Sequence, residues 1–442
     1  MEYRAELERV AAHFQSVPGR LNKANLKHLV TQNHFETFED TLPDGGVRLS
    51  LSGSIVVIDV DFVNGQVTTV SISLASMPAE QSKFSFMANE NHPEVVILGS
   101  LRRPRLGQFA QILEFLSRCD RFSTKDVDCF RALDEVGNAV CTYVSNSMDP
   151  EVKKSFGVPE INPGRLGVGL WYFGNEKNKH HAFIDTCAGS RREFALYVNT
   201  QWLQEDGEWA DVDKEALTPR DVRAELALAL SPPVVVRKSV AQQLKAETSS
   251  AEESLNERRY MSTFTMKRHP AFAQSQKSDD LDVTIANLLP CDWVQISSIP
   301  ISDPKNIPDI LAVLRQDCML LQLVKSVLKG PAIVDNSEAD ISIADALDFK
   351  DKPANFSSFE INLSIQESQD ALVLAGRVSQ GLLSFELTIQ QQIELSLKGS
   401  TDLDRINKGD LLKILETGQL DYAISFVIGS LNLTQRRSSL SR

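Results

Sequence analysis

Residues 47–74 read VRLSLSGSIVVIDVDFVNGQVTTVSISL, and this stretch decides the fold of the amino-terminal part of the chain. Apolar residues recur there at every second position, which is the period of a strand with one buried face. Asn64-Gly65 is the strongest short signal for a two-residue hairpin turn. The stretch therefore predicts an antiparallel hairpin. The apolar residues that we assign to its core face are Val47, Leu49, Leu51, Ile55 and Val57.

The turn fixes the register of this hairpin. With the tip at the Asn-Gly pair, Val57 lies opposite Ile72 and Ile55 lies opposite Leu74. The other face of the first strand is apolar over four positions, which is too apolar for a face left in water. We therefore predict that this outer face binds other proteins, together with one face of an amino-terminal helix, and leave open whether a helix of the same chain covers it instead. The candidate interaction surface consists of Leu7, Val10, Phe14, Val56, Ile58, Val60 and Phe62.

The composition indicates a folded chain of two or three domains. Its 442 residues are 42% hydrophobic, which is enough for each domain to bury a core. A net charge of -13 and a pI of about 5.2 disfavour nonspecific binding to nucleic acid or anionic lipid. The start, MEYRAELERV, is polar, and no apolar run approaches the roughly 20 residues of a membrane helix. We expect a soluble, intracellular protein without direct contact to nucleic acid or membrane.

Residue types that carry chemistry are scattered along the chain. The six cysteines form no CxxC pair, which argues against a zinc module and fits a reducing compartment. Asp59 and Asp61 share a strand face near the hairpin tip, where we expect solvated carboxylates rather than a metal or acid/base pair. His180 and His181 are adjacent, so they point to opposite faces of a strand, and we expect surface histidines. We predict no catalytic residue, no cofactor and no metal site.

The fold class is predicted to be α+β, with antiparallel hairpin and meander sheets packed with helices, in two domains joined by a polar linker. The first domain, residues 1–237, is expected to contain helices up to about residue 35, the hairpin 47–74, helices within 93–144 and short strands within 166–198. Residues 238–282 are polar and charged, which predicts a linker that is in part helical.

A second α+β domain is predicted for residues 283–435. Its expected elements are a helix at 307–329, a meander of strands within 359–397, and terminal helices near 408–416 and 422–432. Residues 436–442 are expected to form a frayed tail. The helix at 307–329 is so apolar that it must be covered over more than half of its circumference. It is interpreted as a central domain helix, with a partner-docking helix as the alternative.

Three blocks of the sequence resemble the Mediator complex subunit 1 family. RLSLSGSIVVIDVDF, the NG turn and VSISLA resemble the hairpin at the start of that family's conserved region. FAQILEFLSRCDRFS, residues 109–123, is similar to the helix that follows in the family. PDILAVLRQDCMLLQLVKSVL, residues 308–328, resembles a later family helix that contains LRQ. The blocks lie in the family's order and span about 280 residues.

The resemblance implies a nuclear transcription coactivator that is not an enzyme. Such a subunit belongs to the middle module of Mediator and helps relay regulatory signals from DNA-bound activators to RNA polymerase II. The implied partners are other middle-module subunits, with subunits four and nine as the expected ones, and indirectly RNA polymerase II and activators. The chain has no LxxLL motif, so it resembles the short, fungal-type form, and nuclear-receptor binding is not expected.

Two other functions stay open at this point. An adaptor scaffold of the cytosol or nucleus, unrelated to Mediator, would share the same architecture. An enzyme would need a pocket that joins distant titratable groups, for example Asp185 and Cys187 with a histidine.

Overall fold

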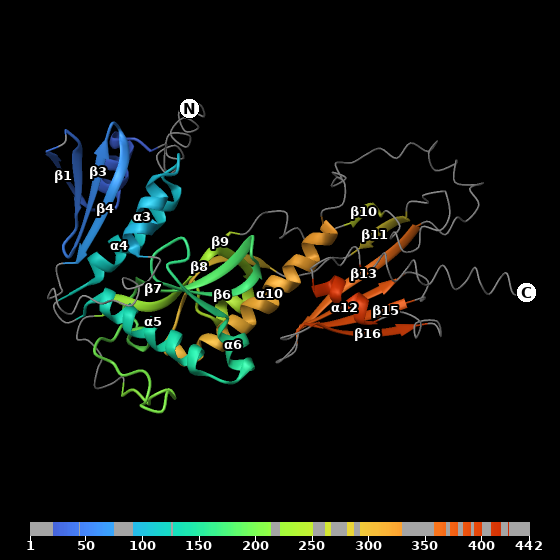
Figure 1. The fold of residues 1–442 in the computed structure, drawn as a ribbon. Helices are drawn as coiled ribbons and strands as arrows, with labels where there is room; N and C mark the ends of the chain where they lie inside the picture. Colours follow the sequence, from blue (N-terminus) through green and yellow to red (C-terminus); the bar gives the residue numbers. More distant parts are fainter. Residues whose placement is uncertain are drawn as a thin grey trace, which may run out of the picture. The chain divides into compact units, whose positions relative to one another are not determined.

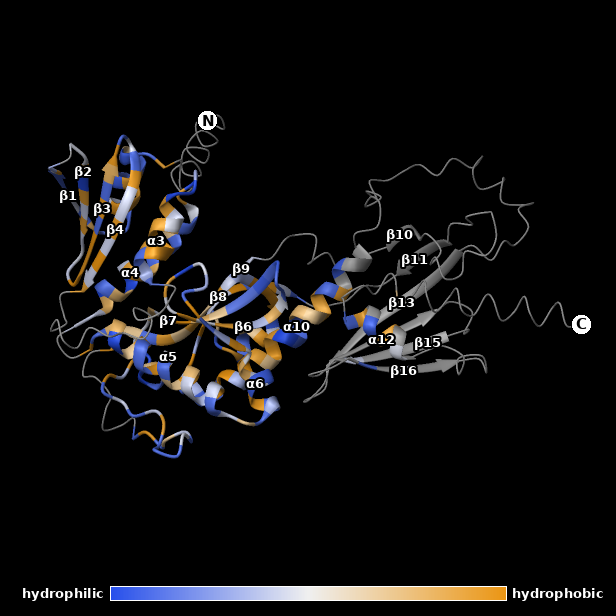
Figure 2. Ribbon diagram, in the orientation of Figure 1, coloured by the Kyte–Doolittle hydropathy of each residue, from blue (hydrophilic) through white to orange (hydrophobic). Residues whose placement is uncertain are grey.

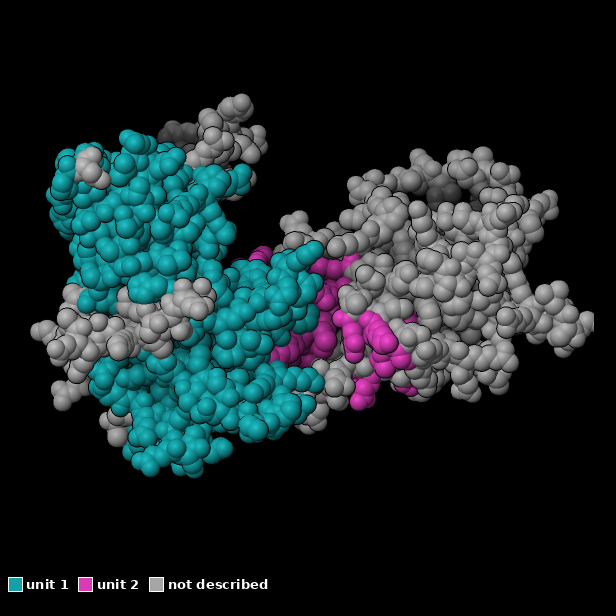
Figure 3. Space-filling model, in the orientation of Figure 1, with its two compact units in different colours: residues 1–233, 244–247, 297–311 teal, residues 234–243, 248–296, 312–442 magenta. Residues whose placement is uncertain are grey.

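The chain forms two compact units, of which Figure 3 colours the described residues. The computed structural model describes residues 21–43, 45–74, 92–124, 127–213, 222–250 and 292–328, and the further segments 261–266, 281–286, 358–367, 372–378, 383–389, 393–399, 408–416 and residue 423. The first unit comprises residues 1–233, 244–247 and 297–311, and the second unit comprises residues 234–243, 248–296 and 312–442.

A four-stranded antiparallel sheet in the order β1-β2-β3-β4 begins the first unit (Figure 1). Its strands are β1 (Glu36–Thr41), β2 (Val47–Ser52), β3 (Val56–Val63) and β4 (Gln66–Leu74). The helices of this part are α2 (Lys23–Gln32), α3 (Pro93–Leu101), α4 (Gly107–Phe122), α5 (Cys129–Asn146) and α6 (Pro150–Phe156). Helices α3 and α4, and all but the last two residues of α5, lie within 93–144 and confirm the helices predicted there.

A six-stranded sheet follows, in the order β5-β6-β7-β8-β12-β9. Its strands are β5 (Val158–Ile161), β6 (Val168–Asn175), β7 (Asn178–Ala188), β8 (Ala224–Arg237), β12 (Trp293–Pro300) and β9 (Thr248–Ser250). Short helices are η2 (Arg192–Phe194), α8 (Lys238–Gln243) and η4 (Pro304–Asn306). Of the short strands predicted within 166–198, β6 and β7 form, whereas residues 192–194 form a short 3-10 helix and Ala195 makes an isolated bridge.

The third sheet has the order β10-β11-β13-β14-β15-β16. Its strands are β10 (Met261–Met266), β11 (Leu281–Ala286), β13 (Ser358–Glu367), β14 (Leu372–Val378), β15 (Leu383–Ile389) and β16 (Ile393–Gly399). The last four strands pair antiparallel in sequence order, which confirms the predicted meander, whereas β11 and β13 pair parallel. The α+β class is confirmed.

Helix α10 (Ile307–Leu328) begins at the residue that the sequence predicted, and α12 (Lys408–Glu416) confirms the first terminal helix. Leu311, Leu314 and Leu320 on α10 are fully buried, which favours the central-helix interpretation. The predicted helix near 422–432 and the tail 436–442 lie outside the described residues, apart from residue 423. Within 238–282 the structure describes α8, β9, β10 and the first residues of β11.

The predicted register of the 47–74 hairpin is wrong by one residue. The turn itself is as predicted, because Val63 pairs with Gln66 across Asn64 and Gly65, which both have positive φ. One extra residue, Thr68, then interrupts the ladder between the Asp61–Thr69 and Phe62–Val67 pairs. The bulge moves Ile58, rather than Val57, opposite Ile72.

This shift places the predicted outer face of β3 in the core. Val56, Ile58 and Val60 are fully buried and Phe62 nearly so, alongside Leu49 and Leu51 of β2, which were correctly assigned to the core. Figure 2 shows hydrophobic residues in orange alternating with hydrophilic residues in blue along the strands of this sheet. Asp59 and Asp61 lie on the same face of β3 as Val57. The predicted register would have turned both carboxylates toward the core, at a large desolvation cost. The assignment of Ile55 and Val57 to the core face is likewise wrong, because both are only half-buried.

Helices of the same chain fix this sheet in place. Helix α3 packs on β4, and the Glu94 carboxylate accepts a hydrogen bond from the Ile72 amide at 3.2 Å. Asp120 of α4 accepts hydrogen bonds from the Ser54, Ile55 and Val56 amides at 2.8, 2.7 and 3.2 Å. These three bonds satisfy the backbone donors of the β2–β3 turn, which would otherwise be costly to bury.

Candidate functional site: buried ion pairs and a charged sheet face

The candidate interaction surface predicted from the sequence is not assembled by the described residues. Val56, Ile58, Val60 and Phe62 belong to the core of the four-stranded sheet. Leu7, Val10 and Phe14 lie outside the described residues. The described residues form two notable polar arrangements instead, a network around Asp185 and the outer face of the four-stranded sheet.

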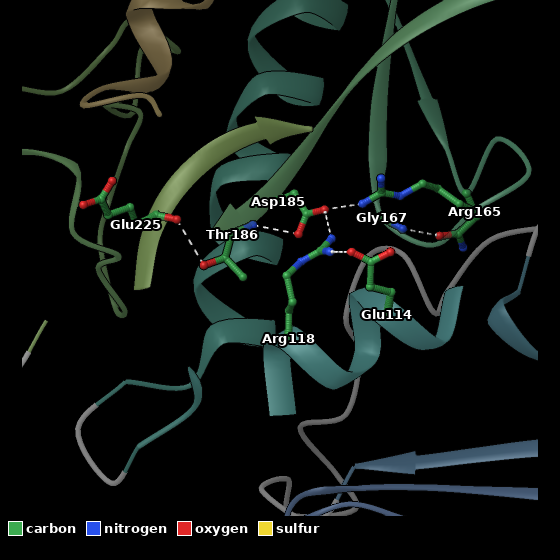
Figure 4. A network of polar contacts seen from close by, with 8 residues as sticks. Glu114, Arg118, Arg165, Gly167, Asp185, Thr186 and Glu225 are labelled. Carbon is green, nitrogen blue, oxygen red and sulfur yellow. Dashed lines mark hydrogen bonds and ion pairs between the residues drawn. The ribbon is translucent and has the colours of Figure 1, made fainter. Parts of the chain in front are cut away.

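Asp185 on β7 is buried, with 1% of its surface exposed, and is held by two arginines (Figure 4). Its Oδ2 accepts from Arg118 Nη2 of α4 at 2.7 Å and from Arg165 Nη2 of the loop before β6. Its Oδ1 accepts from the Thr186 amide at 2.7 Å. Arg118 also donates to Glu114, one helical turn earlier, at 2.6 Å. The network joins α4, β7 and the loop before β6.

The two arginines of this network are held differently, Arg118 by carboxylates and Arg165 also by aromatic rings. Burial by itself lowers the pKa of the Arg118 guanidinium, but Asp185 and Glu114 outweigh it, and the pKa is raised. The Arg165 guanidinium carbon lies 4.4 Å from the Phe183 ring centroid and 5.6 Å from that of Phe115. These cation–π contacts keep the guanidinium between aromatic rings while it pairs with Asp185.

Two further buried carboxylates each form an ion pair with an arginine. Glu225 on β8 is fully buried and accepts from the Arg191 amide at 2.8 Å and from the Arg191 guanidinium at 2.5–3.0 Å. In the second unit, fully buried Asp317 of α10 accepts from Arg237 Nε at 2.8 Å and from the Arg237 amide at 2.9 Å. Pairs of this kind hold elements distant in sequence in one arrangement.

The groups named for an enzyme are not brought together. The carboxylate of Asp185 is engaged by guanidinium groups, and burial raises the pKa of the Cys187 thiol to about 11, with Glu225 adding to the shift. A protonated thiol is a poor nucleophile. His181 lies at the far end of β7, with Nε2 2.7 Å from Glu160. It is buried, so its assignment as a surface histidine is wrong.

Among the residues that the structure describes, no group of three or more His, Cys, Asp or Glu side chains is placed to hold a metal ion. Across the described ranges, no helix has the length and apolar character needed to cross a bilayer.

The outer face of the four-stranded sheet is polar and mostly acidic. The cross-strand registers align Asp40, Arg48, Asp61 and Thr69 in one row. A second row contains Phe38, Ser50, Asp59 and Ser71. With Glu36 on the same face of β1, this surface carries four carboxylates and a single arginine. No sequence motif indicates this acidic face, because its residues come from four different strands.

Arg48 organises the centre of this face. Its Nε and Nη2 donate to the two carboxylate oxygens of Asp61 at 2.7 and 2.9 Å, and its Nη1 lies 3.9 Å from Asp59. Ser50 Oγ lies 2.6 Å from the second oxygen of Asp59. Asp59 and Asp61 are therefore paired, part-buried side chains, and their prediction as solvated carboxylates is wrong.

The Arg48–Asp61 pair predicts a specific loss of stability in acid. The hydrogen bond from Arg48 lowers the pKa of the Asp61 carboxyl below its ordinary 3.8. A carboxyl with a lowered folded-state pKa contributes stability above its unfolded pKa, and the contribution is lost as the pH falls through the folded pKa. Asp61→Asn is therefore expected to be less stable than the native chain near neutral pH. The difference should shrink as the pH falls from about 5 to about 2.

Urea unfolding followed across this pH range, with deuterium uptake in residues 47–74 as the local readout, measures that difference. Asp206→Asn, at an exposed loop position, is the matched control and is expected to follow the native curve throughout. A gap between Asp61→Asn and the native chain that stays constant down to low pH would contradict the assignment.

Comparison with known proteins agrees with the resemblance seen in the sequence. The family model described as Mediator of RNA polymerase II transcription subunit 1 matches residues 8–182 and 197–329. These ranges include all three sequence blocks and most of the described elements of the first unit.

Similar proteins that carry the name Mediator of RNA polymerase II transcription subunit 1 come from three yeasts. The Kluyveromyces lactis protein is 24% identical over 208 residues, 46% of each chain. The Eremothecium gossypii protein is 25% identical over 206 residues, 46% of each chain. The Saccharomyces cerevisiae protein is 25% identical over 195 residues, which cover 42% of this chain and 32% of that protein. The chain thus spans less than half the length of the curated relatives it matches. Because the family model covers well over half of its residues, the chain belongs to the family of Mediator of RNA polymerase II transcription subunit 1.

Proposed function

We propose that this protein is a non-enzymatic subunit of Mediator that acts in RNA polymerase II transcription through protein surfaces. The observation that carries the proposal is the family match over residues 8–182 and 197–329. The described ion pairs are compatible with this role. The buried carboxylates of Asp185, Glu225 and Asp317 all accept hydrogen bonds from arginine guanidinium groups, so they are not available as catalytic acids or bases.

The proposal extends to place and partners. The subunit would lie in the middle module, in the nucleus, and bind the other subunits of that module, with subunits four and nine as the expected neighbours. From there it would help relay signals from DNA-bound activators to RNA polymerase II. The net charge of -13 supports a role through protein contacts rather than through direct binding to DNA. The amino-terminal residues Leu7, Val10 and Phe14 stay proposed as one of the contacts.

Affinity purification from native nuclear extract tests this function. The chain, tagged at its endogenous locus, is expected to co-purify with a megadalton assembly that contains the other Mediator subunits. Crosslinking mass spectrometry on that assembly is expected to link the chain to subunits four and nine. Recovery of the chain as a free monomer would contradict the proposal, as would recovery in a cytosolic complex without Mediator subunits.

A further inference from the structure

Strand β1 is an open edge of the four-stranded sheet. It pairs with β2 along one side, and no other strand of the described ranges pairs with its outer side, where Figure 1 shows it as the last strand of the sheet. The six residues of β1 contain no proline and no bulge. An edge strand of this kind presents outward N–H and C=O groups that a further strand can use.

Two other edges of the described sheets are less open to an added strand. On the opposite edge of the same sheet, the Ile72 amide of β4 already donates to Glu94, and α3 packs on the strand. Strand β5, the edge of the six-stranded sheet, has only four residues and includes Pro159, which has no N–H. Short edges and edge prolines are common ways to prevent the addition of a strand. The open edge of β1 therefore contrasts with the edges formed by β4 and β5.

The side chains of β1 give this edge a chemical preference. Glu36, Phe38 and Asp40 alternate along the outer face of the sheet and are all exposed, Phe38 to 54%. Glu39 points to the opposite face, where Lys23 and Lys27 of α2 neutralise it and lower its pKa. Glu36 and Asp40, the latter opposite Arg48 across the strands, thus lie on one face, on either side of an exposed aromatic ring.

We propose that β1 accepts a basic, extended segment of a partner protein as a fifth strand of this sheet. On an added strand, two basic side chains four residues apart would lie beside Glu36 and Asp40, and an apolar side chain midway between them would contact Phe38. A second copy of this chain is a poor occupant, because antiparallel pairing of β1 about Phe38 would place Glu36 opposite Asp40. The inference deepens the protein-contact role proposed above and rests on it for its biological meaning.

A synthetic peptide provides the test on the purified, full-length chain. The probe is fluorescein-labelled Thr-Arg-Thr-Val-Thr-Arg-Thr, and its comparison peptide has the same sequence and charge but N-methyl groups on the amides that would face β1. We expect the probe to bind at least about tenfold more tightly than the methylated peptide by fluorescence anisotropy. Deuterium exchange should slow in β1 when the probe is bound. Equal binding of the two peptides would overturn the proposal, since it would show attraction by charge alone.

Matched variants locate the site. Glu36→Lys with Asp40→Lys is expected to weaken probe binding at least about tenfold, and Phe38→Ala by a smaller factor. Glu176→Lys with Glu205→Lys makes the same change in net charge at exposed positions elsewhere and should bind within about twofold of the native chain. Equal losses in the two double variants would overturn the proposal. Circular dichroism verifies that each variant is folded, and failure of the nuclear purification would leave the peptide result unchanged.

Discussion

Ile58→Lys is expected to unfold the four-stranded sheet, with a loss of about 4 kcal/mol or more in its free energy of unfolding. Ile58 is fully buried in the central strand β3, between Leu51 on β2 and Ile72 on β4. An ammonium group there would lose its hydration, and Glu39, which lies on the same face of the sheet, is already paired with Lys23 and Lys27. Deuterium uptake in residues 47–74 is expected to rise toward that of an unfolded segment, while the third sheet keeps its protection.

Val57→Lys is the matched control, one residue earlier on the same strand. Its side chain lies on the acidic outer face, in the row of Ser52 and Ser73 and beside Asp59. There a lysine remains hydrated, and the expected change is within about 0.5 kcal/mol. The pair also decides between the two registers, because the register predicted from the Asn-Gly turn alone would make Val57→Lys the destructive variant and Ile58→Lys the tolerated one.

Local sequence signals account for the elements that were predicted correctly. The helices within 93–144, the turn at Asn64-Gly65 and the meander of β13–β16 each follow from spacing, caps or turn residues a few positions apart. The register of β3 was missed because a bulge at Thr68 carries no clear local signal. The correcting signal was nevertheless present, since Asp59 and Asp61 alternate with Val60 and Phe62 and a core face avoids carboxylates.

The candidate sites could not be predicted for a different reason. Arg118 and Asp185 are 67 residues apart, and Arg237 and Asp317 are 80 residues apart. Such pairs arise only when the strands and helices have packed, and a single sequence contains no record of which charges meet. The acidic outer face of the sheet could not be predicted for the same reason, because each of its rows combines single residues from four strands.

Asp185→Asn is expected to be the second most damaging substitution, with a loss of about 3–5 kcal/mol in the free energy of unfolding of the first unit. The amide keeps the shape of the carboxylate, and its oxygen still accepts from the Thr186 amide. The substitution removes the negative charge that compensates the guanidinium groups of Arg118 and Arg165. Arg118 keeps Glu114, but Arg165 loses its carboxylate while 11% of its side chain is exposed. The Nε of each arginine is already buried without an acceptor among the described residues.

A double-mutant cycle separates lost charge compensation from lost packing. Arg165→Met preserves contact with Phe183 and Phe115 and is expected to destabilise the native chain, because Asp185 then keeps only Arg118. In the Asp185→Asn background the same change should instead be stabilising, because it removes the uncompensated charge. Thermal and urea unfolding should yield a coupling of about 1–3 kcal/mol between the two positions.

Glu114→Gln provides the control, since Glu114 is 63% exposed and its loss should cost less than about 1 kcal/mol. Additive losses for Asp185→Asn and Arg165→Met would show that the two side chains act only as packing. A reversal of sign would show that the buried carboxylate stabilises the first unit by neutralising the guanidinium groups that α4 and the loop before β6 bring against β7.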